Sequence, residues 1–186
     1  MELIRRRNML GASGSAIDWE SIARGMIDGT TQFSIGADVA AALEGITTLG
    51  RRTFYYRPNL VGDVVLPNSI TDLNNIEIFS GCGASSVTIG ENCSAINNTV
   101  FQYMGVGMKA LIINRATPPT LNGATPLSGT PQCIIYVPDE AVEDYKAAQY
   151  WSYYANGRIK PISELGGVAD YQPLSGWLFT ERRAAA

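Results

Sequence analysis

The sequence predicts a mainly β repeat fold, a solenoid in which short parallel strands stack on one another. The first observation is an apolar–any–apolar–turn pattern that occurs four times, with starts 23, 24 and 24 residues apart. The four copies begin at Val64, Val87, Leu111 and Ile135. A fixed period in this range is typical of a repeat protein in which each repeat is one structural turn. Such proteins usually present a surface to a partner.

Two further rows of apolar residues keep nearly the same spacing and form the second observation. The rows are Leu49, Leu73 and Ile96, and Phe54, Phe79 and Phe101. Each repeat is therefore expected to contain a strand, a turn, a second apolar segment and a phenylalanine. The Phe ring is expected to fill the interior of the repeat, where one ring buries a large apolar area.

Residues 1–29 are predicted to form a basic lead and an N-terminal capping helix. The lead contains Arg5, Arg6 and Arg7, the basic part of a signal peptide, but no apolar core follows them. This leaves two readings, a signal that has been removed or export by another route. Residues 17–28 have apolar residues at helical spacing and are expected to cover the first end of the stack. Unpaired strand edges at that end need such a cover.

Residues 30–138 are predicted to be the repeat body. An earlier copy of the strand pattern begins at Phe33, 31 residues before Val64, and the extra length leaves room for a helical insertion. Residues 117–131 are rich in proline and are expected to cross the last repeat without helix. The four strands from Val64 onward then form one parallel stack.

Residues 139–162 are predicted to close the second end of the stack with a capping helix and a strand. The helix is expected over residues 139–150, with Asp139 as its N-cap and acidic residues in its first turn. Residues 158–162 are predicted to form a short extended strand. Residues 163–186 form an aromatic-containing tail, in which Trp177, Leu178 and Phe179 need a surface on this domain or on another chain.

The closing segments resemble a known family. They are residues 135–138, 142–146, 151–155 and 159–162, which read IYVP, VEDYK, WSYYA and IKPI. They are similar to the closing module of BspA-like leucine-rich repeat proteins, and residues 64–82 resemble a repeat of that family. The resemblance covers residues 30–162 and implies a leucine-rich-repeat-like right-handed solenoid with N- and C-terminal capping helices. Gly90 and Asn114 depart from it, because the family has proline at these positions.

The resemblance also implies a function. The family includes secreted bacterial adhesins and proteins encoded by phages, and the opening MELIRRR looks more like the phage-encoded kind. We therefore expect a non-enzymatic structural or binding protein of a phage virion, a head- or tail-associated decoration or fibre protein. Its partners are expected to be other virion proteins or identical subunits. The alternative is a secreted adhesin on the bacterial cell surface that binds a host protein or glycan.

Composition argues against several other classes of protein. The 186 residues contain no histidine, which excludes Ser–His–Asp and Cys–His catalysis, so no enzyme activity is expected. The three cysteines, Cys82, Cys93 and Cys133, are expected to be small buried thiols, and neither a metal nor a cofactor is expected. The net charge of −3 and the lack of a basic face argue against nucleic acid as a partner. No apolar run reaches 18 residues, so membrane insertion is not expected.

The candidate binding residues come from strand alternation. In each copy of the pattern the outer residues point inward and the middle residue points outward. The outward row is Ser34, Val65, Thr88, Ile112 and Tyr136. Two interpretations remain open, a packed row that stiffens the sheet and a docking stripe for another protein or an identical subunit.

Overall fold

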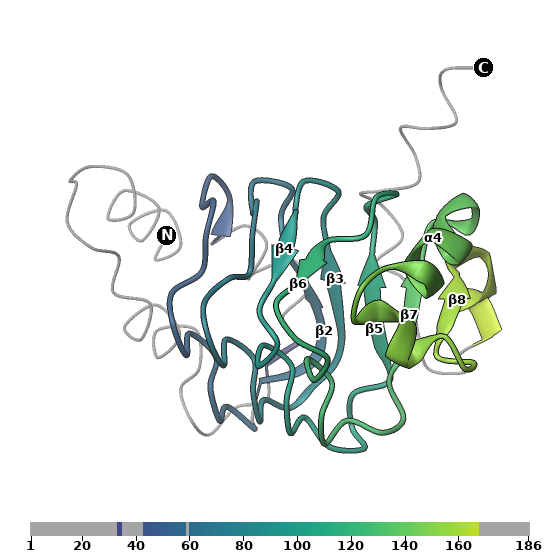
Figure 1. Ribbon diagram of the computed structural model, residues 1–186. Coiled ribbons are helices and arrows are strands. Elements are labelled where there is room, and N and C mark those ends of the chain that lie inside the picture. The colour runs from purple at the N-terminus through teal and green to yellow at the C-terminus, as the bar shows by residue number, and fades with distance from the viewer. Residues whose placement is uncertain (1–32, 35–42, 59, 168–186) are drawn as a thin grey trace.

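The computed structural model describes residues 33–34, 43–58 and 60–167, which form a mostly parallel β-sheet that is not closed, with few helices. The sheet has the order β1-β2-β3-β5-β7-β8. Its strands are β1 (Phe33–Ser34), β2 (Leu60–Val65), β3 (Ala84–Ile89), β5 (Ala110–Ile113), β7 (Ile134–Val137) and β8 (Ile159–Pro161). A second, two-stranded sheet pairs β4 (Ala95–Ile96) with β6 (Thr120–Leu121). Figure 1 shows the main-sheet strands β2, β3, β5, β7 and β8 following one another in chain order along the molecule.

The register of the main sheet confirms the parallel pairing predicted from the repeats. Val64 pairs with Val87, Val87 with Leu111, and Leu111 with Ile135. Ile159 of β8 extends the same row by one strand. Because each strand of this row aligns with the next about 24 residues later, equivalent residues of successive repeats are neighbours in space.

The interior is filled by the two apolar rows that the sequence predicts. Phe79 stacks between Phe54 and Phe101, with ring centroids 5.0 and 5.7 Å away and planes 13° apart on both sides. All three rings are fully buried. In the second row, Leu73 forms a parallel bridge with Ile96, which pairs in turn with Leu121.

Asparagine side chains tie the second segments of successive repeats together. Asn75 Nδ2 donates to the carbonyl oxygen of Leu49 at 2.6 Å, and Asn97 Nδ2 donates to that of Asn74 at 3.1 Å. The partners in each pair belong to successive repeats. Carbonyl groups in these non-strand segments would otherwise lack partners, and partly buried polar groups need them.

One predicted pairing at the first end is wrong. Ser34 pairs with Val61 and not with Val65, because β2 is six residues long and β1 lies along its beginning. Ser34 is therefore not the first member of the row that continues through Val65. The predicted lead and helix at residues 1–29 and the tail residues Trp177, Leu178 and Phe179 lie outside the described residues.

The predicted capping helix at residues 139–150 is also wrong in its extent. The segment divides into η1 (Asp139–Ala141), α4 (Val142–Ala147) and η2 (Trp151–Tyr154), and the next element is β8. Asp139 does not cap a helix, since its Oδ1 accepts a hydrogen bond from the backbone N–H of Ser163 at 3.0 Å. The helix ends because Ala148 is extended, with ψ 149°, and Tyr150 takes a left-handed φ of 67°.

The closing segment packs against the segment that precedes β7. The Tyr145 hydroxyl donates to the carbonyl oxygen of Arg115 at 2.8 Å, and its ring meets that of Trp151 edge-on, with centroids 5.3 Å apart. Both aromatic side chains are fully buried. The predicted extended strand becomes β8, which lies beside β7 in Figure 1, and η3 (Ile162–Gly167) follows it.

Candidate functional site

The predicted outward row exists from Val65 onward. Val65 pairs with Thr88, Thr88 with Ile112, and Ile112 with Tyr136. Alternation places this row on the opposite face of the sheet from the main core. Ile112 and Tyr136 belong to a separate apolar cluster, whereas their chain neighbours Leu111 and Ile135 belong to the core.

Two members of this outward row, Ile112 and Tyr136, are buried. Each is only 3% exposed, because Leu165 of η3 packs over them together with the partly buried Ile162. Leu165 lies in the segment that the sequence analysis assigned to a tail, and Ile162 lies at the end of the predicted closing segment. At this end of the row, cross-strand packing therefore describes the structure. Whether any part of the row binds a partner stays a prediction.

The other half of the outward face is polar. The Ser86 hydroxyl donates to Oδ1 of Asp63 at 2.6 Å, and the Ser85 hydroxyl lies 3.3 Å from the same oxygen. Thr88 is buried and Val65 is partly buried. Both serine hydroxyls therefore bond one oxygen of Asp63, which pairs with Ser86 two residues before Val65.

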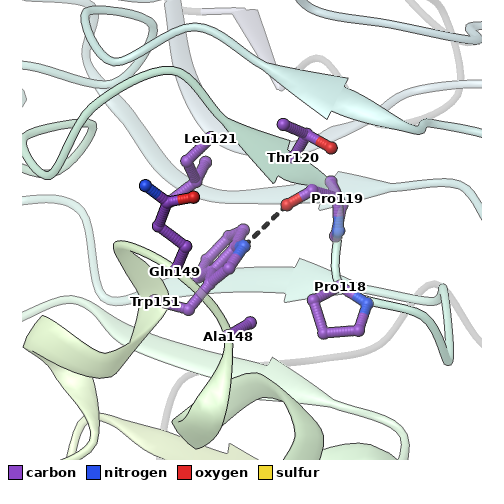
Figure 2. Close-up of a pocket in the computed structure, with 7 residues that line it drawn as sticks. All are labelled: Pro118, Pro119, Thr120, Leu121, Ala148, Gln149 and Trp151. Carbon is purple, nitrogen blue, oxygen red and sulfur yellow. Dashed lines mark hydrogen bonds between the residues drawn. The ribbon is translucent and has the colours of Figure 1, made fainter.

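A small pocket lies between the last repeat and the closing segment. It measures about 180 Å³ and is lined by Pro118, Pro119, Thr120, Leu121, Ala148, Gln149 and Trp151. Figure 2 shows Trp151 reaching across it, with Nε1 donating to the carbonyl oxygen of Pro119 at 2.7 Å. Pockets for small-molecule ligands are usually about 300–1,000 Å³, so this one is better explained as the seam between two packed segments.

The cysteines have the buried environment that the sequence predicts. Cys82, Cys93 and Cys133 are free and buried. Burial raises the pKa of Cys82 and of Cys133 to about 12, and that of Cys93 to about 11. A thiol needs its thiolate form to attack or to bind metal, so these groups are unreactive at neutral pH. Across residues 43–58 and 60–167, no three cysteine or acidic side chains lie close enough to hold a metal ion.

A feature that sequence reasoning missed is a column of left-handed residues at one corner of the repeats. Each member lies two residues after a buried apolar residue, which is Phe54, Phe79, Phe101 or Leu127. The column consists of Tyr56, Gly81, Tyr103 and Gly129, with φ values of 48°, 69°, 56° and 72°. Hydrogen bonds join successive members of the column through Ser80, Gln102 and Ser128, with N–O distances of 2.8–2.9 Å. Tyrosine and glycine therefore alternate at one structural position.

The two tyrosines of this column are exposed, and each is packed onto the glycine of the next repeat. Tyr56 is 59% exposed and Tyr103 is 61% exposed. A Cβ atom built on Gly81 would lie 3.2 Å from the Tyr56 ring, and one built on Gly129 would lie 2.9 Å from the Tyr103 ring. The spacing two residues after Phe54, Phe79 and Phe101 was the signal in the sequence that could have revealed this column.

Neither the known protein families nor the curated proteins compared with this chain gave a match. Within the described part of the chain, no helix has the length and apolar character needed to cross a membrane.

Proposed function

We propose that this chain is a non-enzymatic structural and binding protein built as a leucine-rich-repeat-like right-handed solenoid with a cap at each end. The observation that carries the proposal is the unbroken parallel register from Val64 to Ile159. In such a stack each repeat contacts its neighbours, and equivalent side chains recur in straight rows along the surface. A rigid row of this kind suits the repeated contacts of a spacer or binding surface.

The chemistry of the described residues supports a binding role. The buried thiols have raised pKa values, and one oxygen of Asp63 accepts hydrogen bonds from two serine hydroxyls. The pocket beside Trp151 is a seam of about 180 Å³. A cavity large enough for a substrate and lined by several titratable groups would favour catalysis, and these features differ from that pattern.

We further propose that the protein is a component of a phage virion, as the resemblance to BspA-like repeat proteins and the opening residues 1–7 suggest. The anchor is the tail, with Trp177, Leu178 and Phe179 buried against another virion protein or an identical subunit. The test removes residues 168–186 and leaves Leu165 in place, because Leu165 packs on the sheet. We expect the truncated protein to fold but to be missing from purified particles.

Two sets of point substitutions distinguish loss of the anchoring side chains from the general effect of deleting the tail. Trp177→Ala, Leu178→Ala and Phe179→Ala together should remove the protein from particles, whereas the three substitutions Arg5→Ala, Arg6→Ala and Arg7→Ala should not. Immunoblots of density-purified particles provide the measurement. Particles that still carry the truncated protein would show that the anchor lies elsewhere, and particles that never carry the intact protein would contradict virion location.

The second candidate function is a secreted bacterial surface adhesin. The exposed rings of Tyr56 and Tyr103 favour it, since exposed aromatic groups that are held in place are common at binding surfaces. The two functions differ in location, so immunogold labelling of intact cells and of particles with one antibody distinguishes them. Label on cells but not on particles would support the adhesin.

A further inference from the structure

We infer that Tyr56 and Tyr103 form two stacking platforms for an extended β-linked polysaccharide chain. This inference rests on the proposed function, since it requires the chain to be a binding scaffold. It names a ligand class and a site on that scaffold. The site lies at the corner of the repeats, away from the outward row of the main sheet that ends under Leu165.

Backbone conformation supplies the first argument. A left-handed φ costs roughly 1–2 kcal/mol for a residue with a side chain, and it costs glycine almost nothing. The column needs this conformation at every level, and Gly81 and Gly129 meet the need without strain. Tyr56 and Tyr103 meet it at a cost, so stability alone favours glycine at both positions. Strained residues of this kind cluster at functional sites.

The orientation of both rings is fixed before any ligand arrives. The Tyr56 ring rests on Gly81 and meets the Tyr55 ring edge-on, with centroids 4.6 Å apart. The guanidinium of Arg52 lies 4.8 Å above the Tyr55 ring and pairs with Glu77 at 2.6 Å. The Tyr103 ring rests on the backbone of Gly129 in the same way. Ligand binding therefore needs little further ordering of these side chains, which favours affinity.

The spacing of the rings supplies the ligand class. Tyr56 and Tyr103 are two levels apart in the column, which corresponds to about 10 Å at the usual separation of neighbouring strands. This distance is comparable to one disaccharide of an extended β-1,4-linked glycan, in which alternate sugars present the same face. Each ring covers the glycine of the next repeat, Tyr56 over Gly81 and Tyr103 over Gly129, so both rings are shifted by the same step and keep this two-level separation. Tyrosine suits this ligand because its ring contacts the C–H face of a sugar while its hydroxyl stays hydrated.

The pattern also fits a glycan better than a protein partner. A protein interface is built around a contiguous, well-packed apolar core. Here the two exposed rings lie on separate levels of the column, and each covers the glycine of the next repeat. Polar groups lie nearby, since Arg52 and Glu77 pair at the level of Tyr55, and Gln102 precedes Tyr103. Separate aromatic platforms with polar groups between them match a ligand that is itself polar at its edges and repetitive.

The test is isothermal titration calorimetry of the full chain with three hexasaccharides. Cellohexaose and chitohexaose provide β-1,4-linked chains, and maltohexaose provides the α-linked control. We expect at least one β-linked chain to bind and maltohexaose not to bind. Tyr56→Gly and Tyr103→Gly should each weaken binding by about tenfold or more, and the double variant should abolish it. Tyr56→Phe and Tyr103→Phe should retain most of the affinity.

The glycine variants are chosen because the fold already uses glycine at this position in alternate repeats. They should melt at or above the temperature of the unmodified chain, which separates loss of binding from loss of folding. Tyr153→Ala, at a residue that is 69% exposed but outside the column, is the matched control and should bind normally. Three results would overturn the inference: neither β-linked chain binds, maltohexaose binds equally well, or the glycine variants bind like the unmodified chain. None of them bears on whether particles carry the protein.

Discussion

The ring of Phe79 lies parallel to that of Phe54, with centroids 5.0 Å apart and planes at 13°. The two residues are 25 positions apart in the chain, so this contact links the interiors of neighbouring repeats. The stack continues to Phe101 and runs through the middle of the described body. Its central ring is therefore the most informative place to test the packing.

Replacing Phe79 with alanine should destabilise the protein strongly. The side chain is fully buried and has a stacked partner on each side, so its removal leaves a cavity that two repeats share. We expect a loss of about 3–5 kcal/mol in the free energy of unfolding, measured by urea denaturation. Tyr153→Ala, on an exposed ring, should change it by less than about 0.5 kcal/mol. Equal effects would mean that the Phe stack does not hold the repeats together.

Replacing Leu165 with aspartate should uncover the outer apolar cluster. Leu165 packs on Ile112 and Tyr136, and a carboxylate at that position would lose its water against apolar partners. We expect a lower unfolding free energy and increased binding of the dye ANS to the folded protein. Glu164→Ala is the control, because Glu164 is exposed and its ion pair with Lys160 lies on the surface. An unchanged dye signal in Leu165→Asp would contradict the packing of η3 on the sheet.

Gly129→Ala should cost more than Gly105→Ala, although both residues have a left-handed φ. The new Cβ at residue 129 would lie 2.9 Å from the Tyr103 ring, whereas that at residue 105 meets nothing within 4 Å. Both variants lose the freedom of glycine, and Gly129→Ala also has to move the ring, which adds about 1 kcal/mol or more. Thermal melts provide the comparison. Adding Tyr103→Gly should reduce the extra cost to the part that comes from the Cα and N atoms of residue 103, which lie 3.2 and 3.3 Å from the new Cβ. No reduction at all would show that the ring does not rest on Gly129.

Acidification should weaken the contact between Asp139 and η3. The hydrogen bond from Ser163 lowers the pKa of Asp139 below its usual 3.8. A carboxylate with a lowered folded-state pKa stabilises the fold above its unfolded pKa, and that contribution is lost as pH falls through the folded value. The difference in urea midpoint between the unmodified chain and Asp139→Asn should therefore shrink below pH 3.8. If the difference in urea midpoint stays constant as the pH falls through this range, the Asp139 carboxylate is not the source of that difference.

The sequence was sufficient to predict the repeat rows and their parallel pairing. Residues such as Val64, Val87 and Leu111 could be aligned because buried positions accept few residue types, and this leaves a visible period. The interior Phe stack was predictable for the same reason. The strand at residues 159–161 was predicted, but its place beside β7 required the structure.

Other features depend on contacts that no local pattern encodes. Asp139 has the sequence context of an N-cap, yet the backbone N–H of Ser163 competes for its carboxylate and the predicted long helix breaks up. Leu165 was assigned to a tail because nothing in its neighbourhood shows which surface it covers. The left-handed conformation at Tyr56 and Tyr103 is hidden because tyrosine rarely adopts it, whereas glycine at the same position would suggest it.

The most direct test of the account is a set of nuclear Overhauser contacts between backbone protons of the main sheet. The account predicts contacts from Val87 to Leu111 and from Leu111 to Ile135, in the pattern of parallel neighbours, with the equivalent contact from Ile135 to Ile159 at the closing strand. Contacts that pair these segments antiparallel, or that join Val87 directly to Ile135, would contradict the stacked repeats on which both the fold and the proposed binding surface depend.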